Sequence, residues 1–227
     1  MRSLINRFID NSRQTLLLGM LVLVIGYPLL TVGSHAPPAP LLELRGGATA
    51  FADIHKIITC HLVHFTSSHL FLDLTMFLLL GSICERQTGK WYRLLLLFFA
   101  TSVGTGIAML LPDGAGYRGL SGVVTAQCMF VLVVFGGRAF RNKNLSAIMI
   151  LASAAAGLAF KFVFEGVTKV AMFSYDMNTN GIIPSPAAHL LGASAGVICG
   201  LIWEMRNCRT RDNVNRKEHI KMLGASS

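Results

Sequence analysis

The sequence predicts an all-α membrane protein, a bundle of six transmembrane helices, and three observations lead to this fold class. Of the 227 residues, 53 % are hydrophobic and only 14 % are charged. The mean hydropathy of +0.57 is not typical of a soluble domain. Six apolar stretches alternate with short polar segments, and a helix of about 20 apolar residues is long enough to cross a bilayer.

Each stretch is defined by its composition and by the residues that bound it. The first follows a basic start, as in a secretory signal, but its length and the later apolar stretches favour a retained helix. Prolines and glycines interrupt residues 34–56, which predicts a substantial loop, and a tight turn is expected at 112–116. A second long loop is expected at 164–186. The predicted spans are residues 15–32, 57–84, 91–111, 119–135, 145–164 and 187–205.

The basic residues indicate the orientation of the bundle. With six spans, the two termini and the second and fourth loops lie on one side and hold 15 of the 20 Lys and Arg residues. Because such residues are retained in the cytoplasm, both termini are expected there, and the short termini favour a bacterial inner membrane. We expect a cytoplasmic amphipathic N-terminus at 1–14, a membrane domain at 15–205 and a basic cytoplasmic tail at 206–227.

This topology also explains the formal net charge of +9. The lipid bilayer is therefore an expected partner, and nucleic acid is not. The five cysteines are odd in number and unclustered. They match neither a disulfide framework nor a zinc-finger spacing, and no metal or cofactor is expected.

Ser121 stands where a loop turns into the fourth predicted span, within Gly119-Leu120-Ser121-Gly122. A serine hydroxyl reacts only if a base takes its proton and other groups stabilise the oxyanion. Ser121, His69 and His189 each precede the first cytoplasmic arginine of their own span by 17 residues. At about 1.5 Å of rise per residue, each lies roughly 25 Å above the cytoplasmic boundary. The three groups therefore share one level, a little below the outer surface.

The last predicted span has a feature that favours close packing. Three glycines recur every fourth residue: Gly192, Gly196 and Gly200. Such a ridge lets two helix backbones approach closely, and His189 projects from nearly the same side as Gly192. With Gly122 on the partner helix, this packing predicts a hydrogen bond between Ser121 and His189. The first turn of that helix offers unpaired backbone N–H groups for an oxyanion.

The second predicted span carries four ionisable residues, His61, His64, His69 and Asp73. Ionisable side chains inside a membrane are candidates for function. We expect His64 to support the site by hydrogen-bonding a loop backbone, and His61 to be an interfacial side chain. Lys161 and Glu165, one turn apart, are interpreted as a paired helix end that reaches the headgroups.

Taken together, these residues resemble the rhomboid family of intramembrane serine proteases, over about residues 57–204. The resemblance is carried by three motifs in order, on alternate predicted helices: His64-Phe65-Thr66-Ser67-Ser68-His69-Leu70-Phe71-Leu72-Asp73, then Gly119-Leu120-Ser121-Gly122, then Ala188-His189 with Gly192 and Gly196. It implies a six-helix bundle that cleaves membrane-anchored proteins near the outer surface. It also implies a dyad without a carboxylate, with Ser121 as nucleophile, His189 as base and His69 as an oxyanion donor beside the Ser121 backbone N–H.

Two residues depart from the family pattern. Asp73 stands where the family commonly has asparagine, so Asp73 is expected either to be protonated or to orient a histidine. Thr125 stands where many members have an aromatic ring that packs on the catalytic histidine. Arg118 and Asp73 are similar to the rhombosortase branch, bacterial enzymes that process proteins with a C-terminal Gly-Gly sorting tail. Transfer of the acyl group to an amine, instead of hydrolysis, is then open.

Two alternative functions remain open from the sequence. The first is a metal or haem protein, with ligands drawn from His61, His64, His69 and His189 together with Cys60 or Asp73. The angle of about 140° between His64 and His69 on a helix argues against it. The second is a catalytically inactive rhomboid-like protein that binds membrane proteins. The substrate and the oligomeric state are not determined by the sequence.

Overall fold

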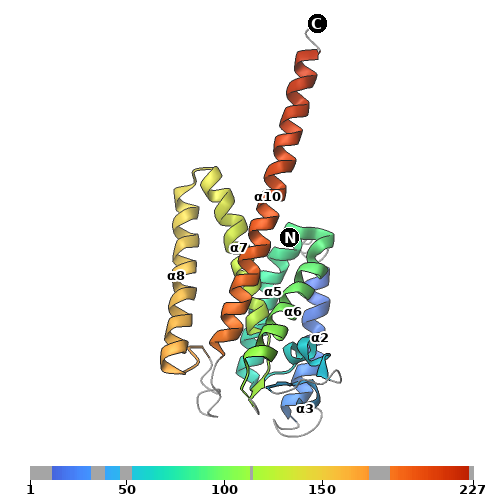
Figure 1. Cartoon of the computed structure of the whole chain (residues 1–227), viewed down its shortest axis with the longest axis vertical. Helices are drawn as coiled ribbons and strands as arrows, with labels where there is room; N and C mark the ends of the chain where they lie inside the picture. Colours follow the sequence, from blue (N-terminus) through green and yellow to red (C-terminus); the bar gives the residue numbers. More distant parts are fainter. Residues whose placement is uncertain (1–11, 32–38, 47–52, 113–114, 174–184, 225–227) are drawn as a thin grey trace, which may run out of the picture.

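The computed structural model describes residues 12–31, 39–46, 53–112, 115–173 and 185–224. The described chain is mainly helical, and its long helices run side by side as a bundle (Figure 1). Six of the described helices have 19 residues or more: α2 (Arg13–Thr31), α5 (Ser67–Thr88), α6 (Tyr92–Leu110), α7 (Ser121–Arg141), α8 (Leu145–Thr168) and α10 (Pro186–Gly224).

Four stretches of the described chain are long and apolar enough to cross a membrane: Ser67–Leu110, Ser121–Arg141, Leu145–Thr168 and Pro186–Thr210. The first of these contains both α5 and α6, which are joined by the 3-10 turn η3 (Gly89–Trp91). Arg13–Pro28 is a shorter apolar helix. The predicted class of helical membrane protein is therefore confirmed at this level.

The second predicted span, residues 57–84, is wrong as a single helix. The chain forms the short helix α4 (Lys56–Thr59) and the 3-10 turn η2 (Cys60–Leu62), and α5 begins only at Ser67. Thr66 ends the irregular segment because its side chain accepts a hydrogen bond from the backbone N–H of His69 at 3.2 Å, which caps α5. His61 and His64 consequently precede the helix, whereas His69 and Asp73 lie in its first two turns.

Two short strands connect the loops beneath the bundle. β1 (Leu44–Arg45) pairs antiparallel with β2 (Gly116–Tyr117), and a short helix α3 (Ala39–Leu42) precedes β1. The pairing ties the expected loop at 34–56 to the segment that leads directly into Ser121. Residues 1–11 of the expected amphipathic N-terminus, the remainder of that first loop and residues 174–184 of the loop at 164–186 lie outside the described residues.

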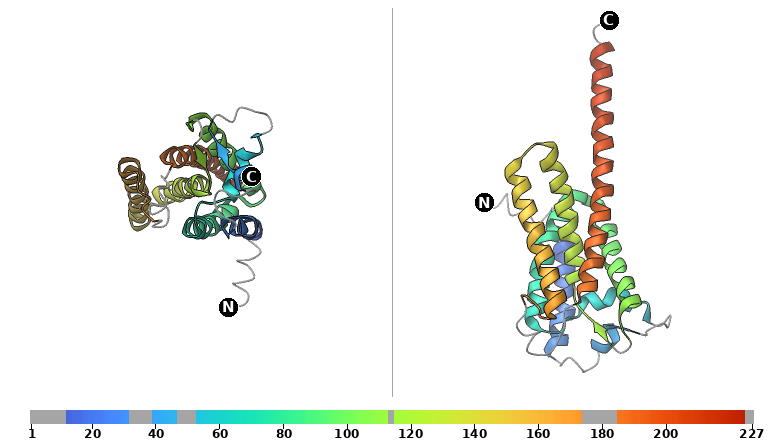
Figure 2. Two further views of the ribbon diagram at one scale, coloured as in Figure 1. Left: turned by 90° about the horizontal axis from the view of Figure 1, so that it is seen from below. Right: turned by 60° about the vertical axis from the view of Figure 1, so that its left-hand side comes forward.

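Helix α7 lies between α8 and α10, and α8 occupies the outer side of α7 (Figures 1 and 2). Helix α10 packs on α7 through the predicted glycines. A Cβ added at Gly192 would overlap the carbonyl oxygen of Gly122, and one added at Gly196 would overlap that of Ala126. Beyond the bundle, α10 continues as a helix through the basic tail to Gly224 (Figure 1).

Candidate active site

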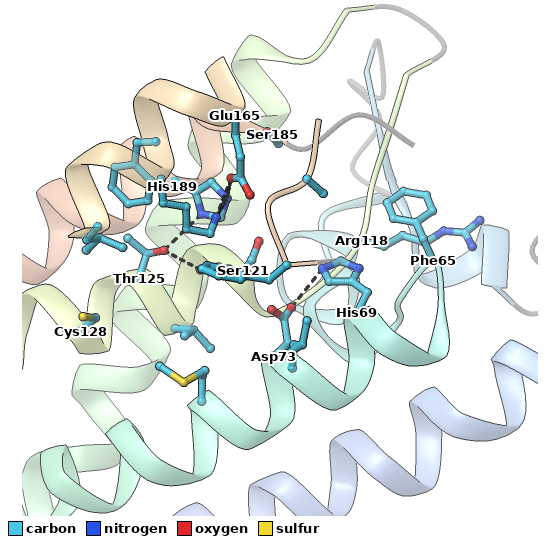
Figure 3. A pocket seen from close by; sticks show the side chains of 18 of the residues that line it. Phe65, His69, Asp73, Arg118, Ser121, Thr125, Cys128, Glu165, Ser185 and His189 are labelled. Atoms are coloured by element: carbon cyan, nitrogen blue, oxygen red, sulfur yellow. Dashed lines mark hydrogen bonds and ion pairs between the residues drawn. The ribbon is translucent and has the colours of Figure 1, made fainter. Parts of the chain in front are cut away.

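Ser121, His69 and His189 line one cavity of about 470 Å³, although they come from three different helices (Figure 3). Asp73 and Thr125 line it as well. In the view of Figure 3, Ser121 lies between His189 on one side and the pair of His69 and Asp73 on the other. Residues that the sequence placed at one depth are thus in one site.

The backbone that leads into Ser121 is fixed by buried partners. The Gly119 N–H donates to the carbonyl of Cys60 at 3.0 Å, and the Leu120 N–H donates to Asp73 Oδ2 at 2.9 Å. Gly119 has a φ of +120°, a region open to glycine but strained for other residues. Ser121 is the first residue of α7, so its own N–H and those of the next residues have no partner within the helix.

His61 also supports this loop, so the expectation of an interfacial side chain is wrong. The ring is buried, and its Nδ1 and Nε2 lie 3.0 Å from the carbonyl oxygens of Gly119 and Ala100 respectively. Burial lowers the pKa of His61, so the ring is neutral at pH 7 and donates to one of the two carbonyls. The Tyr117 hydroxyl donates to the Gly119 carbonyl at 3.3 Å.

Asp73 is the centre of a buried polar cluster. Its Oδ2 accepts the Leu120 N–H and lies 3.3 Å from Nε2 of both His64 and His69. His64 therefore contacts a carboxylate and not, as expected, a loop backbone. Burial lowers the pKa of His64. Of the two expected roles for Asp73, the geometry favours orienting histidines, because Oδ2 serves as an acceptor.

His69 is held between two neighbours. Its ring stacks on Phe65 with centroids 6.4 Å apart, and its Nε2 faces Asp73. Phe65 also contacts Arg118, whose guanidinium carbon lies 5.0 Å from the ring centroid. The Arg118 Nη2 donates to Glu43 Oε2 at 3.1 Å, and Arg118 lines the same cavity. The residue before the Gly-Leu-Ser-Gly motif thus belongs to the wall of the site.

His189 is bound to α7 by Thr125. The Thr125 hydroxyl lies 3.2 Å from His189 Nδ1 and donates to the carbonyl of Ser121 at 2.8 Å. Among the described residues, this contact takes the place of the expected hydrogen bond between Ser121 and His189. The aromatic ring that Thr125 does not provide comes from Phe162 of α8, which stacks on His189 with centroids 5.2 Å apart and planes at 12°.

Lys161 and Glu165 pair near the end of α8 as expected, but both line the cavity and Glu165 is buried, so the expectation that the pair reaches the headgroups is wrong. Lys161 Nζ lies 3.3 Å from His189 Nε2, and Glu165 Oε2 lies 3.4 Å from the same nitrogen. Sequence analysis noticed the pair but assigned it to the surface. The sequence did contain a signal for a role in the site, because two ionisable residues in an otherwise apolar span are candidates for function.

The described residues hold no group of three or more His, Cys, Asp or Glu side chains arranged to bind a metal ion. The five cysteines are free thiols. Burial raises the pKa of the Cys60 thiol to about 12, so this thiol is not ionised at neutral pH. The polar side chains that line the cavity are those of two serines, a threonine, a tyrosine, a cysteine, two histidines, two carboxylates and two cations.

Comparison with known proteins agrees with this arrangement. Residues 52–206 match the model of the rhomboid domain. The chain is 28 % identical over 168 residues to the rhomboid protease GlpG of Haemophilus influenzae. The aligned segment covers 71 % of this chain and 74 % of that protein. The matched segment includes every residue that lines the cavity. The chain therefore belongs to the rhomboid family, the family of intramembrane serine proteases.

Proposed function

We propose that this protein is a serine endopeptidase that cleaves membrane-anchored proteins, with Ser121 as nucleophile and His189 as general base. One observation carries the proposal most directly: Ser121 and His189 line one cavity, and Thr125 binds the His189 ring one turn along the same helix from Ser121. A small movement of the ring along α7 would exchange the Thr125 hydroxyl for the Ser121 hydroxyl.

The proposed reaction uses groups on both sides of Ser121. His189 takes the hydroxyl proton as Ser121 Oγ attacks the scissile carbonyl, and it returns the proton to the leaving amine. The Ser121 backbone N–H, at the positive end of α7, stabilises the oxyanion together with His69. Asp73 holds His69 and the Leu120 amide in place. Water or a second amine then releases the acyl-enzyme.

We propose six membrane spans, formed by α2, α5, α6, α7, α8 and α10, with both termini in the cytoplasm of a bacterium. The basic residues of the tail and of the α5–α6 and α7–α8 connections support this orientation. The cavity then opens in the outer half of the membrane, where the end of a substrate's transmembrane helix can unfold. Entry beside α8 agrees with the exposed position of that helix, in whose apolar window no residue is buried.

We further propose membership of the rhombosortase branch, whose substrates carry a C-terminal Gly-Gly sorting tail. Support comes from Arg118 and Asp73, the two residues that are similar to this branch, which both line the cavity. Arg118 is held by Glu43 and by the ring of Phe65. Its charge is thus fixed beside the site instead of extending into solvent.

The experiment is covalent labelling of Ser121 by a serine-reactive fluorophosphonate in membranes that contain the full chain. Wild-type protein is expected to be labelled, Ser121→Ala not at all, and His189→Ala about a hundredfold or more slowly, because a positioned base contributes about 10²–10⁴ to the rate. Ser194→Ala is the matched control. The Ser194 hydroxyl lies on α10 and donates to the Leu190 carbonyl of the same helix, so this variant should be labelled like the wild type.

Each of two results would contradict the proposal. Labelling that persists in Ser121→Ala would assign the reactive hydroxyl elsewhere. Labelling that survives His189→Ala undiminished would remove His189 as the base. A wild-type chain that is folded in detergent but is not labelled would favour the inactive, substrate-binding alternative.

A further inference from the structure

Both nitrogens of the His189 ring have partners among the described residues, and neither of these partners is Ser121. The Thr125 hydroxyl donates its one proton to the Ser121 carbonyl at 2.8 Å, so it can only accept from His189 Nδ1 at 3.2 Å. A neutral imidazole that carries its proton on Nδ1 has its lone pair on Nε2. Nε2 is therefore the atom that can take a proton from Ser121.

The lone pair on Nε2 faces an ammonium group of α8. Lys161 Nζ lies 3.3 Å from Nε2, and an ammonium group can donate but cannot accept. Glu165 Oε2 lies 3.4 Å from the same nitrogen, on the side of the ring away from Thr125 (Figure 3), but an ionised carboxylate has no proton to give to a lone pair. Lys161 is thus the donor to Nε2, and the atom that the reaction needs as a base is occupied.

Lys161 is held at the ring by its own helix. Its ammonium pairs with Glu165 Oε2 at 2.5 Å, and its side chain is 19 % exposed. Glu165 is the one buried residue among the described residues of α8, and it also accepts the Met172 N–H at 3.1 Å. Phe162, the residue after Lys161, stacks on the His189 ring. Because a lysine in a membrane helix can extend its charge to the headgroups, a lysine fixed beside a buried ring indicates a specific role.

We propose that Lys161 caps the general base, and that the extended backbone of a substrate in the cavity releases the cap. The proposal rests on the Ser121–His189 dyad and adds its regulation. Lys161 lines the cavity, and the carbonyl oxygens of an extended segment need hydrogen-bond donors once they leave water. These oxygens accept from the Lys161 ammonium in place of Nε2. The base therefore becomes free when a substrate is present.

Release of the cap transfers no proton. The hydrogen bond from Lys161 to Nε2 breaks, the ammonium keeps its three protons, and its charge stays paired with Glu165. The ring then leaves Thr125 and turns Nε2 toward Ser121. As Ser121 Oγ forms its bond to the scissile carbonyl carbon, its O–H bond breaks and the proton passes to Nε2.

The test compares the rate of fluorophosphonate labelling of the full chain in the wild type and in Lys161→Met, each at the pH of its own highest rate. Methionine is also unbranched and flexible, but it has no proton to donate. A hydrogen bond to a charged group corresponds to a change in population of about tenfold or more. Because only molecules whose Nε2 is free can react, Lys161→Met should be labelled about tenfold faster than the wild type. Loss of a merely structural contact would slow the labelling instead.

Three further variants complete the test. Lys161→Arg keeps the charge and the donors, and it should be labelled no faster than the wild type. Lys169→Met removes an exposed lysine at the end of the same helix that does not line the cavity, and it should be labelled like the wild type. Lys161→Met leaves the buried Glu165 carboxylate without its cation, which can prevent folding. Lys161→Met/Glu165→Met removes both charges, and it should also be labelled faster than the wild type.

The proposal is overturned if Lys161→Met and the double variant, both folded, are labelled at or below the wild-type rate. A Lys161→Arg rate as high as that of Lys161→Met would overturn it as well. The gain must also vanish when Lys161→Met is combined with His189→Ala, because the cap acts on that ring alone. A gain that persists there would mean that loosening of α8, and not release of the base, opens the site.

The dyad is tested separately from the cap. If Ser121→Ala and His189→Ala suppress labelling while Lys161→Met reacts like the wild type, only the cap fails. If Ser121→Ala is still labelled, the dyad itself fails, whatever the rate of Lys161→Met.

Discussion

Replacing Gly119 by alanine should distort the site through two separable effects. The residue has a φ of +120°, which L side chains rarely adopt. In addition, a Cβ at this position would lie 2.7 Å from His69 Cε1 and 3.2 Å from Asp73 Oδ2. Both neighbours are buried, and Asp73 holds the Leu120 N–H, so neither can move without breaking a contact of the site.

The size of the effect follows from these two terms. The backbone strain contributes about 1–3 kcal/mol, and forcing an extra carbon into a packed region contributes about 1–3 kcal/mol. We therefore expect Gly119→Ala to lower the free energy of unfolding by about 2–6 kcal/mol in total. Because the displaced groups are His69 and Asp73, labelling of Ser121 should fall together with stability.

Gly89 provides a matched control for the first effect alone. Its φ is also positive, at +55°, but an added Cβ would meet nothing within 4 Å. Gly89→Ala should lower the free energy of unfolding by about 1–3 kcal/mol and leave labelling unchanged. Unfolding in detergent and fluorophosphonate labelling measure both outcomes. If Gly119→Ala matched Gly89→Ala in stability and reacted at the wild-type rate, the steric argument for this loop would be refuted.

Two further predictions concern the packing of α10 and the buried histidines. Gly192→Ala should destabilise the bundle by about 1–3 kcal/mol. The control is Gly157→Ala, where an added Cβ meets nothing within 4 Å, and it should be neutral or slightly stabilising. Equal stability of the two variants in detergent would contradict the close α7–α10 contact. Because burial lowers the pKa of His61, the unfolded chain binds a proton that the folded chain does not, so this residue should reduce stability as the pH falls below about 6.5. His61→Gln should reduce the slope of the free energy of unfolding against pH by up to about 1.4 kcal/mol per pH unit. A substitution of the exposed His55 should leave this slope unchanged. An unchanged slope in His61→Gln would show that His61 is not the titrating group.

The helices were predictable where apolar length was the main signal. The expected spans at 91–111 and 145–164 agree closely with α6 and α8. The stretch at 57–84 was not predictable from hydropathy, because its apolar residues continue through an irregular segment. The signal that ends this segment is a single hydroxyl, the Thr66 cap of α5, which average hydropathy does not register.

The grouping of the candidate site residues was predictable, but their contacts were not. Counting residues from the cytoplasmic arginines placed Ser121, His69 and His189 at one level, and all three line the cavity. The contacts of His61 and Asp73 with the loop before Ser121 join residues 58 and 47 positions apart. No local pattern encodes such a pairing, because it depends on how the segments pack.

The sequence by itself determined the helical membrane class, the grouping of Ser121, His69 and His189 and the smooth face of α10, because these depend on composition and on a regular rise per residue. Only the tertiary structure decided what surrounds His189. The direction in which α8 presents Phe162 and Glu165 depends on its rotation against α7, which is set by packing between helices. A lysine and a glutamate four residues apart can pair equally well at a membrane surface or beside a buried imidazole ring. The fold alone places them beside the ring.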